Sequence, residues 1–235
     1  MNTGHGPRAR LRDLLGHAWV AYHRSTPPHR GKQAAARLLD RTLGPFVVRT
    51  PAGVWLEAFA ASSMDMSYFE SRRPWDEPIL DVLRSLSPGE AFVDVGANIG
   101  FYTLQAARAV GADGRVYAFE PSPREFRRLL LALEMNDAAN VIPMSCALGS
   151  EPGEANLDVR STHTGTSAFT SQRGDGIVRV PVLPGDTVLG KYRVDKVLGQ
   201  GAMGVVLAVT NVDLQKPFAV KIMRAGKARE DQRQR

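Results

Sequence analysis

AFVDVGANIGFY, at residues 91–102, carries the strongest fold signal in this chain. The apolar run from Ala91 to Val95 predicts a short buried strand. A turn containing Gly96 and Gly100 follows, and an amphipathic stretch starts directly after it. Glycine at these points lets the chain reverse, lets a ligand approach the backbone and lets a helix begin close to the strand. Strand, glycine turn and helix in this order begin a nucleotide-type α/β unit.

A second strand is predicted at residues 114–121, and an acid, Glu120, lies at its end. A carboxylate there, about 20 residues beyond the glycine turn, is placed to accept hydrogen bonds from ribose hydroxyls. The glycine pattern is G-x-x-x-G, and the missing third glycine disfavours NAD and FAD. Asp94, two residues before Gly96, favours a ligand with positive charge. The sulfonium and amino groups of S-adenosylmethionine (SAM) carry such a charge.

The glycine turn, the strand that ends at Glu120 and the segments after it together resemble a known family. FVDVGANIGFYTLQAA, GRVYAFEPSP, the helix predicted at 129–136 and NVIPMSCALGSEPGEANL resemble the FkbM-type SAM-dependent methyltransferases, from about Val93 to about Val182. The resemblance implies a Rossmann-like α/β sheet, SAM as cofactor and O-methyl transfer to a small molecule, sugar or lipid. It also implies that Glu120 holds the ribose, and that the methionine side of SAM is lined by Asp94, Gly96, Asn98 and Gly100. No general base is assigned, so the catalytic residues remain unknown.

Composition limits the remaining functions. Hydrophobic residues make up 43% of the 235 residues, which is ordinary for a globular core. The net charge is +6, and the surplus lies towards the two ends of the chain, so solvated basic termini are preferred over nucleic-acid binding. The single cysteine, Cys146, excludes an intrachain disulfide and disfavours a cysteine-based metal site. With no apolar run of membrane-spanning length and no signal peptide, we expect a cytoplasmic protein that binds neither metal nor nucleic acid.

Upstream of residue 91 the sequence predicts a basic, helical leader at 1–45. Leu11, Leu14, Leu15, Ala18 and Trp19 recur at helical spacing, which fits a packing helix or a loose leader better than a membrane-surface helix. A second helix is predicted at 32–43, a hairpin at 46–57 and a further helix at 78–86. These segments contribute no motif of their own.

Downstream of Glu120 the sequence predicts a third core strand at 140–146 and further strands at 156–159 and 177–182. The loop between the last two is rich in Ser, Thr and Gly, and its His163, Thr164 and Ser167 are candidates for substrate binding. After Val182 the family pattern stops, because the expected K-I-D-V-E-G strand is missing. A sheet without its fourth strand would leave an open apolar edge, which predicts poor stability.

A second motif follows, G-x-G-x-x-G-x-V at 199–206 with the strand-like Phe218-Ala219-Val220-Lys221 after it. From about 190 to 235 the chain resembles the start of a bacterial Ser/Thr protein kinase, that is, a β-rich fragment of its small lobe. The resemblance implies an ATP site, in which the loop glycines cover the phosphates, Val206 contacts adenine and Lys221 pairs with the phosphates. The loop glycines are Gly199, Gly201 and Gly204. No H-R-D, D-F-G or A-P-E segment follows, so we expect no phosphoryl transfer.

The sequence therefore predicts three parts: the leader at 1–45, a truncated methyltransferase domain at 46–183 with the first three core strands and accessory strands, and a truncated kinase fragment at 184–235. Three hypotheses remain open. The chain is a SAM-dependent methyltransferase, an ATP-binding kinase fragment, or a hybrid reading frame with neither activity. Titration with SAM and with Mg-ATP separates them.

Overall fold

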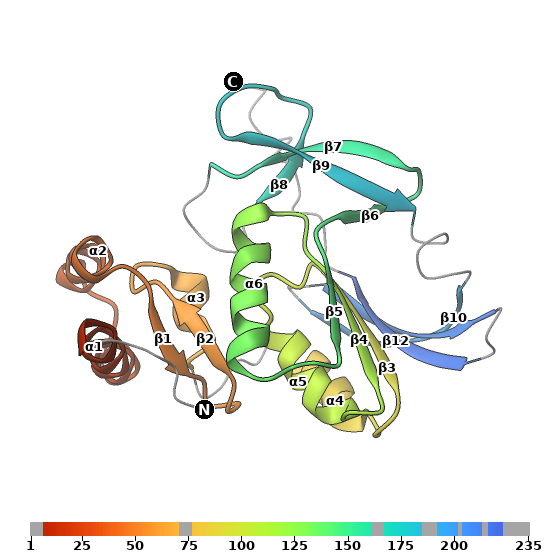
Figure 1. Ribbon diagram of the computed structural model, residues 1–235, viewed down its shortest axis with the longest axis horizontal. Coiled ribbons are helices and arrows are strands. Elements are labelled where there is room, and N and C mark those ends of the chain that lie inside the picture. Colours follow the sequence, from red (N-terminus) through yellow and green to blue (C-terminus); the bar gives the residue numbers. More distant parts are fainter. Residues whose placement is uncertain are drawn as a thin grey trace.

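The computed structural model describes residues 7–70, 77–160, 167–184, 192–201, 204–212 and 216–222 (Figure 1). Within these ranges the chain forms a six-stranded sheet, a four-stranded sheet and a two-stranded hairpin. The predicted α/β class and its parallel sheet are confirmed by this arrangement.

The N-terminal part is a helical layer over a hairpin. Its elements are α1 (Pro7–Ser25), α2 (Arg30–Leu43), β1 (Phe46–Arg49), β2 (Trp55–Ala58) and the short α3 (Ser63–Ser67). Helix α1 ends just before Pro27 and Pro28, as expected for a chain that cannot continue a helix through proline. The hairpin pairs Phe46 with Ala58, and its turn contains Gly53 at a φ of 83°. Buried side chains from all five of these elements form one apolar cluster, which includes Phe46 and Phe69.

The six-stranded sheet lies at the centre of the molecule, and helices cover one of its faces (Figure 1). The segment from residue 77 to 144 supplies three parallel strands and the helices that cover them. Its elements are α4 (Glu77–Ser85), β3 (Ala91–Val95), α5 (Phe101–Val110), β4 (Arg115–Phe119), α6 (Pro123–Met135) and β5 (Val141–Met144). Strand β3 pairs parallel with β4, and β4 pairs parallel with β5. The predicted strand at 91–95 and the helix after it are therefore confirmed. Phe92, Val116 and Val141 pack against α4, α5 and α6 in the largest apolar cluster.

The other side of β3 is occupied, and this overturns one sequence prediction. Strands β10 (Tyr192–Gly201), β11 (Gly204–Asn211) and β12 (Lys216–Ile222) form an antiparallel set, and β12 pairs parallel with β3. The sheet order is β10-β11-β12-β3-β4-β5. The prediction of an open apolar edge at β3 is wrong, because residues 219–222 hydrogen-bond along residues 92–95. The inference of poor stability loses its basis.

The remaining strands form a separate sheet beyond the carboxyl ends of the central strands (Figure 1). They are β6 (Ala147–Gly149), β7 (Gly153–Asp158), β8 (Ala168–Thr170) and β9 (Ile177–Pro184), in the order β6-β9-β7-β8. Strands β7 and β9 correspond to the two strands predicted at 156–159 and 177–182. Among the described helices, none has the length and hydrophobicity to span a bilayer.

Candidate functional site

The glycine turn after β3 lies at the carboxyl edge of the parallel sheet, where ligands of open α/β sheets bind. Three of its residues have left-handed backbones, with φ of 75° at Gly96, 55° at Asn98 and 92° at Gly100. The amides of Gly96 and Ala97 both donate to the carbonyl oxygen of Phe119, at 2.8 and 2.9 Å. The turn is therefore fixed to the end of β4, which carries Glu120.

Gly100 allows close packing of two helices. A Cβ atom built on it would lie 2.7 Å from Cδ1 of Leu129, at a φ of 92° that L side chains rarely adopt. From the sequence, this glycine is expected to let the helix approach the strand. In the structure the nearest side chain belongs to α6, so Gly100 brings the start of α5 against α6.

Glu120 connects the glycine turn to the start of α6. Its Oε2 accepts a hydrogen bond from the amide of Asn98 and its Oε1 one from the amide of Ser122, both at 2.8 Å. The side chain is 7% exposed. Both donors are backbone amides, so the carboxylate fixes the glycine turn to the start of α6.

Asp94 is held by the helix that follows the turn. Its Oδ2 accepts a hydrogen bond from the Thr103 hydroxyl at 2.7 Å, and both residues are completely buried. The bond joins β3 to α5 across the turn.

Tyr68 approaches the site from the N-terminal part, and the sequence analysis did not identify it. Its ring stacks on Phe101 at a centroid distance of 4.7 Å, and its hydroxyl lies 3.5 Å from Nδ2 of Asn98. Asn98 is 8% exposed, and its Oδ1 has no hydrogen-bond partner. No sequence signal points to Tyr68, because it lies 30 positions before Asn98 and outside any motif.

A buried ion cluster fixes the segment that carries Tyr68. Arg128 of α6 donates to Asp65 of α3 at 2.8 Å and to the carbonyl oxygen of Glu57 at 2.6 Å. Its Nε also lies 3.2 Å from Oε1 of Glu57, as an ion pair without an aligned hydrogen bond. Arg128 and Asp65 are 2% and 0% exposed, so the cluster attaches α3 firmly to the central unit.

The residues of the predicted ATP site lie in the strands beside β3. Gly199 and Gly201 are in β10, Gly204 and Val206 in β11, and Lys221 in β12. Since β10 and β12 run parallel to β3, Gly201 lies at the same sheet edge as Gly96, three strands away. Residues 202–203, within the predicted phosphate loop, lie outside the described residues. Strand register places Lys221 opposite Asp94.

The predicted substrate loop is described only in part. His163 and Thr164 lie outside the described residues, whereas Ser167 precedes β8 and its buried hydroxyl has no hydrogen-bond partner. The sheet that contains β8 extends beyond the carboxyl ends of β3, β4 and β5 (Figure 1). Ser167 and β8 are thus on the side of the molecule that carries the glycine turn.

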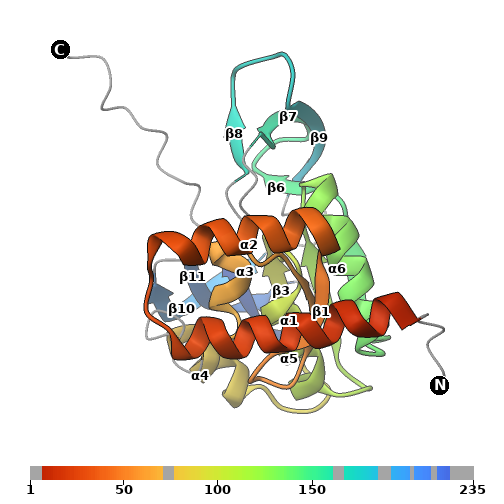
Figure 2. The same ribbon diagram turned by 90° about the vertical axis from the view of Figure 1, so that its left-hand side faces the viewer.

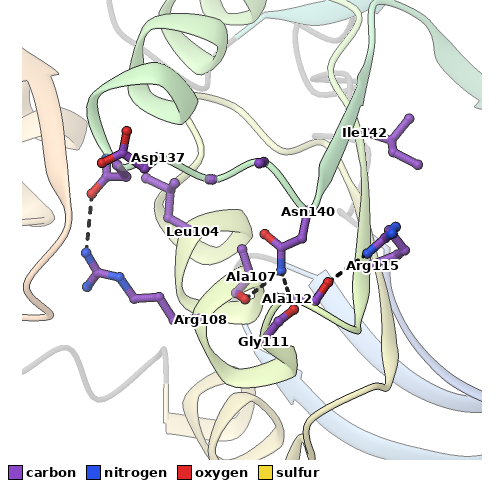
Figure 3. Close-up of a pocket in the computed structure, with 12 residues that line it drawn as sticks. Leu104, Ala107, Arg108, Gly111, Ala112, Arg115, Asp137, Asn140 and Ile142 are labelled. Atoms are coloured by element: carbon purple, nitrogen blue, oxygen red, sulfur yellow. Dashed lines mark hydrogen bonds between the residues drawn. The ribbon is translucent and has the colours of Figure 1, made fainter.

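A cavity of about 400 Å³ lies at the other end of the central unit (Figure 3). It is lined by the last turn of α5 and the loop from α6 to β5, including Arg108, Gly111 and Asn140. The Nδ2 of Asn140 closes its floor by donating to the carbonyl oxygens of Ala107 and Gly111, both at 2.8 Å. None of the predicted site residues contributes to it.

Two further expectations concern metal and thiol chemistry. Among the described residues no group of three His, Cys, Asp or Glu side chains could hold a metal ion. Cys146 follows β5 and is a free, buried thiol whose pKa is raised by burial. A raised pKa keeps the thiol protonated at neutral pH, which fits a small buried residue better than a nucleophile.

Comparison with protein families gives one match. Residues 94–197 match the methyltransferase FkbM domain. The match begins at Asp94, includes the glycine turn and Glu120, and ends in β10. It gives no support to a kinase segment, and a comparison with curated proteins finds no match.

Solved structures give short, distant likenesses. TYW2 of M. jannaschii in complex with AdoMet is 22% identical over 43% of this chain and 42% of that chain, with a TM-score of 0.34. TYW2 of P. horikoshii in complex with MeSAdo is 19% identical over 49% and 48%, with a TM-score of 0.36. A SAM-dependent O-methyltransferase of Thermotoga maritima is 23% identical over 46% and 43%, with a TM-score of 0.29. The chain spans less than half the length of each, and scores this low do not establish a shared architecture.

Proposed function

We propose that the chain binds SAM at the glycine turn after β3 and transfers its methyl group to an oxygen of a small molecule, sugar or lipid. The observation that carries the proposal is the match of residues 94–197 to the methyltransferase FkbM domain. The matched segment begins at Asp94 and includes this turn. SAM, when bound, supplies an electrophilic methyl group on a sulfonium centre.

The polar groups at the turn fit this ligand. Asp94 and Glu120 supply negative charge, and Oδ1 of Asn98 is a buried acceptor without a donor in the protein. A ligand with an ammonium group, a sulfonium group and ribose hydroxyls would satisfy such acceptors. Glu120 would hold the ribose through its carboxylate, and Asn98 and Asp94 would face the amino-acid part. The positive φ of Gly96 supports close approach of the ligand to the backbone.

Catalysis would depend mainly on positioning. Methyl transfer is an in-line displacement, so a site that aligns the acceptor oxygen with the methyl group lowers the barrier without a nucleophilic side chain. The segment from residue 161 to 175 is our candidate for holding the acceptor, because it is rich in Ser, Thr and Gly and its described part leads into β8, in the sheet beyond the carboxyl ends of the central strands. The exclusion of nucleic acid as acceptor stays a prediction, as does the three-part division of the chain.

The ATP site is not part of this proposal. The comparison with protein families gives no support to a kinase segment. Strand β12 pairs with β3 and so belongs to the central sheet. We infer that β10, β11 and β12 complete the sheet of the methyltransferase unit.

Calorimetric titration of the full chain tests the proposal. We expect SAM to bind and Mg-ATP to give no heat of binding. The matched variant is Gly96→Val, in which a β-branched side chain at a φ of 75° would distort the turn and abolish binding. Binding of ATP without binding of SAM, or SAM binding unaffected by Gly96→Val, would reject the proposal.

A further inference from the structure

An apolar stripe on α1 faces solvent. Leu11, Leu14 and Leu15 are 56%, 65% and 38% exposed, and Tyr22 is 38% exposed. Their spacing places them on one face of the helix. The sequence favoured a packing helix or a loose leader over a membrane-surface helix. In the structure α1 does pack on the protein, but through a face other than the one that carries these leucines.

The packed face of α1 is a different one. Val20 is 7% exposed, and a Cβ atom on Gly16 would lie only 2.4 Å from the Phe46 ring. The glycine therefore lets the helix backbone lie directly on β1. This close contact fixes the rotation of α1 and directs the leucines outwards.

The surface around the stripe is basic. Residues 7–43 contain eight Lys and Arg and two Asp. Both aspartates are turned towards the protein: Asp13 accepts from the amide of Val47 at 3.1 Å, and Asp40 accepts from those of Ala60 and Ala61 at 2.7 and 2.8 Å. Asp13 also pairs with Arg12 at 3.2 Å, and Lys32 is buried. Among the described side chains, the exposed basic groups near the stripe are therefore those of Arg24, Arg37 and Arg41.

Helix α2 extends the same surface. Figure 2 shows α1 and α2 side by side across one face of the molecule. Leu38 of α2 is 62% exposed, and Arg37 and Arg41 are exposed as well. We call the outer side of residues 11–41 the helical face. It combines exposed leucines with positive charge over two adjacent helices.

We propose that the helical face docks on a bilayer that contains anionic phospholipid. Helices of this kind lie in the plane of the interface, with apolar side chains in the acyl boundary and basic side chains near the headgroups. A second copy of the chain is a poor occupant, because it would bring two basic layers together. Nucleic acid would match the charge but leave the leucines without an apolar partner.

Sedimentation with vesicles tests the proposal on the full chain. We expect the protein to bind vesicles of equal parts phosphatidylcholine and phosphatidylglycerol, and to bind pure phosphatidylcholine much more weakly. Added salt should weaken binding because it screens the lipid charge. The double variant Leu11→Gln/Leu14→Gln should bind about tenfold or more weakly, since both leucines would enter the acyl boundary.

The matched control is Leu130→Gln, which removes a leucine that is 43% exposed on α6, a helix that is not part of the helical face. It should bind as the wild type does. Circular dichroism checks that each variant keeps its helices, which is expected because all three leucines are solvent-exposed. Failure to bind anionic vesicles, equal binding of neutral vesicles, equal loss with Leu130→Gln, or a leucine-dependent dimer in solution would overturn the proposal.

Discussion

Replacing Glu120 by Gln tests whether its carboxylate holds the glycine turn. The carboxylate accepts from the Asn98 and Ser122 amides, each at 2.8 Å, and is 7% exposed. Glutamine has nearly the same shape but only one acceptor oxygen, so one amide would face an NH2 group. A hydrogen bond to a charged group contributes about 1.5–3 kcal/mol, and we expect the free energy of unfolding to fall by about that amount.

Urea denaturation followed by circular dichroism measures this difference. The control is Glu90→Gln, because Glu90 also accepts from a backbone amide, that of Ser87 at 2.7 Å, but in an exposed turn. We expect the control to change the free energy of unfolding by about 0.5 kcal/mol or less. If Glu120→Gln unfolds at the same urea concentration as wild type and control, the carboxylate does not hold the turn. In the same variant SAM should bind about 10- to 150-fold more weakly, because a ribose hydrogen bond to the charged carboxylate is lost.

Three further perturbations probe other parts of the structure. Arg128→Met should lower the free energy of unfolding by about 3–5 kcal/mol, because it removes the ion-pair partner of the fully buried Asp65. The control Arg127→Met changes an exposed arginine and should leave stability nearly unchanged. Equal stabilities of the two variants in urea would refute the ion cluster. Hydrogen bonds from Arg160 hold the pKa of Asp158 at about 2, below its ordinary 3.8. The pair therefore stabilises the folded state at pH values above 3.8, and this stabilisation is lost as the pH falls through about 2. The urea midpoints of wild type and Asp158→Asn should therefore converge as the solution is acidified, and a constant difference would contradict this. Finally, the chain should transfer no phosphate from radiolabelled ATP; transfer that is lost in Lys221→Met would restore the kinase hypothesis.

The local parts of the site could be predicted from the sequence because their signals are local. An apolar run, two glycines and an amphipathic stretch define β3, the turn and α5, and the acid at the end of β4 follows at a fixed distance. The backbone geometry agrees, with left-handed φ at Gly96 and Gly100. These features depend on the preferences of neighbouring residues and not on distant contacts.

The parts that were not predicted depend on long-range packing. The pairing of β12 with β3 joins residues more than a hundred positions apart, and no periodicity encodes that choice of partner. The helical spacing of Leu11, Leu14 and Leu15 correctly groups them on one face. It does not say which face packs, which is decided by Gly16 against Phe46. The approach of Tyr68 to Asn98 likewise follows from the attachment of α3 to α6 by Arg128 and Asp65.

Hydrogen–deuterium exchange of the full chain with and without SAM tests whether SAM binds at the glycine turn. We expect SAM to protect the amides in peptides that cover residues 94–104 and 118–122, where the turn and Glu120 lie. The cavity at the other end of the unit supplies the competing location, in peptides that cover residues 107–115 and 136–142. Protection at the turn supports the account, whereas protection confined to the cavity, or none with SAM in excess, would contradict it.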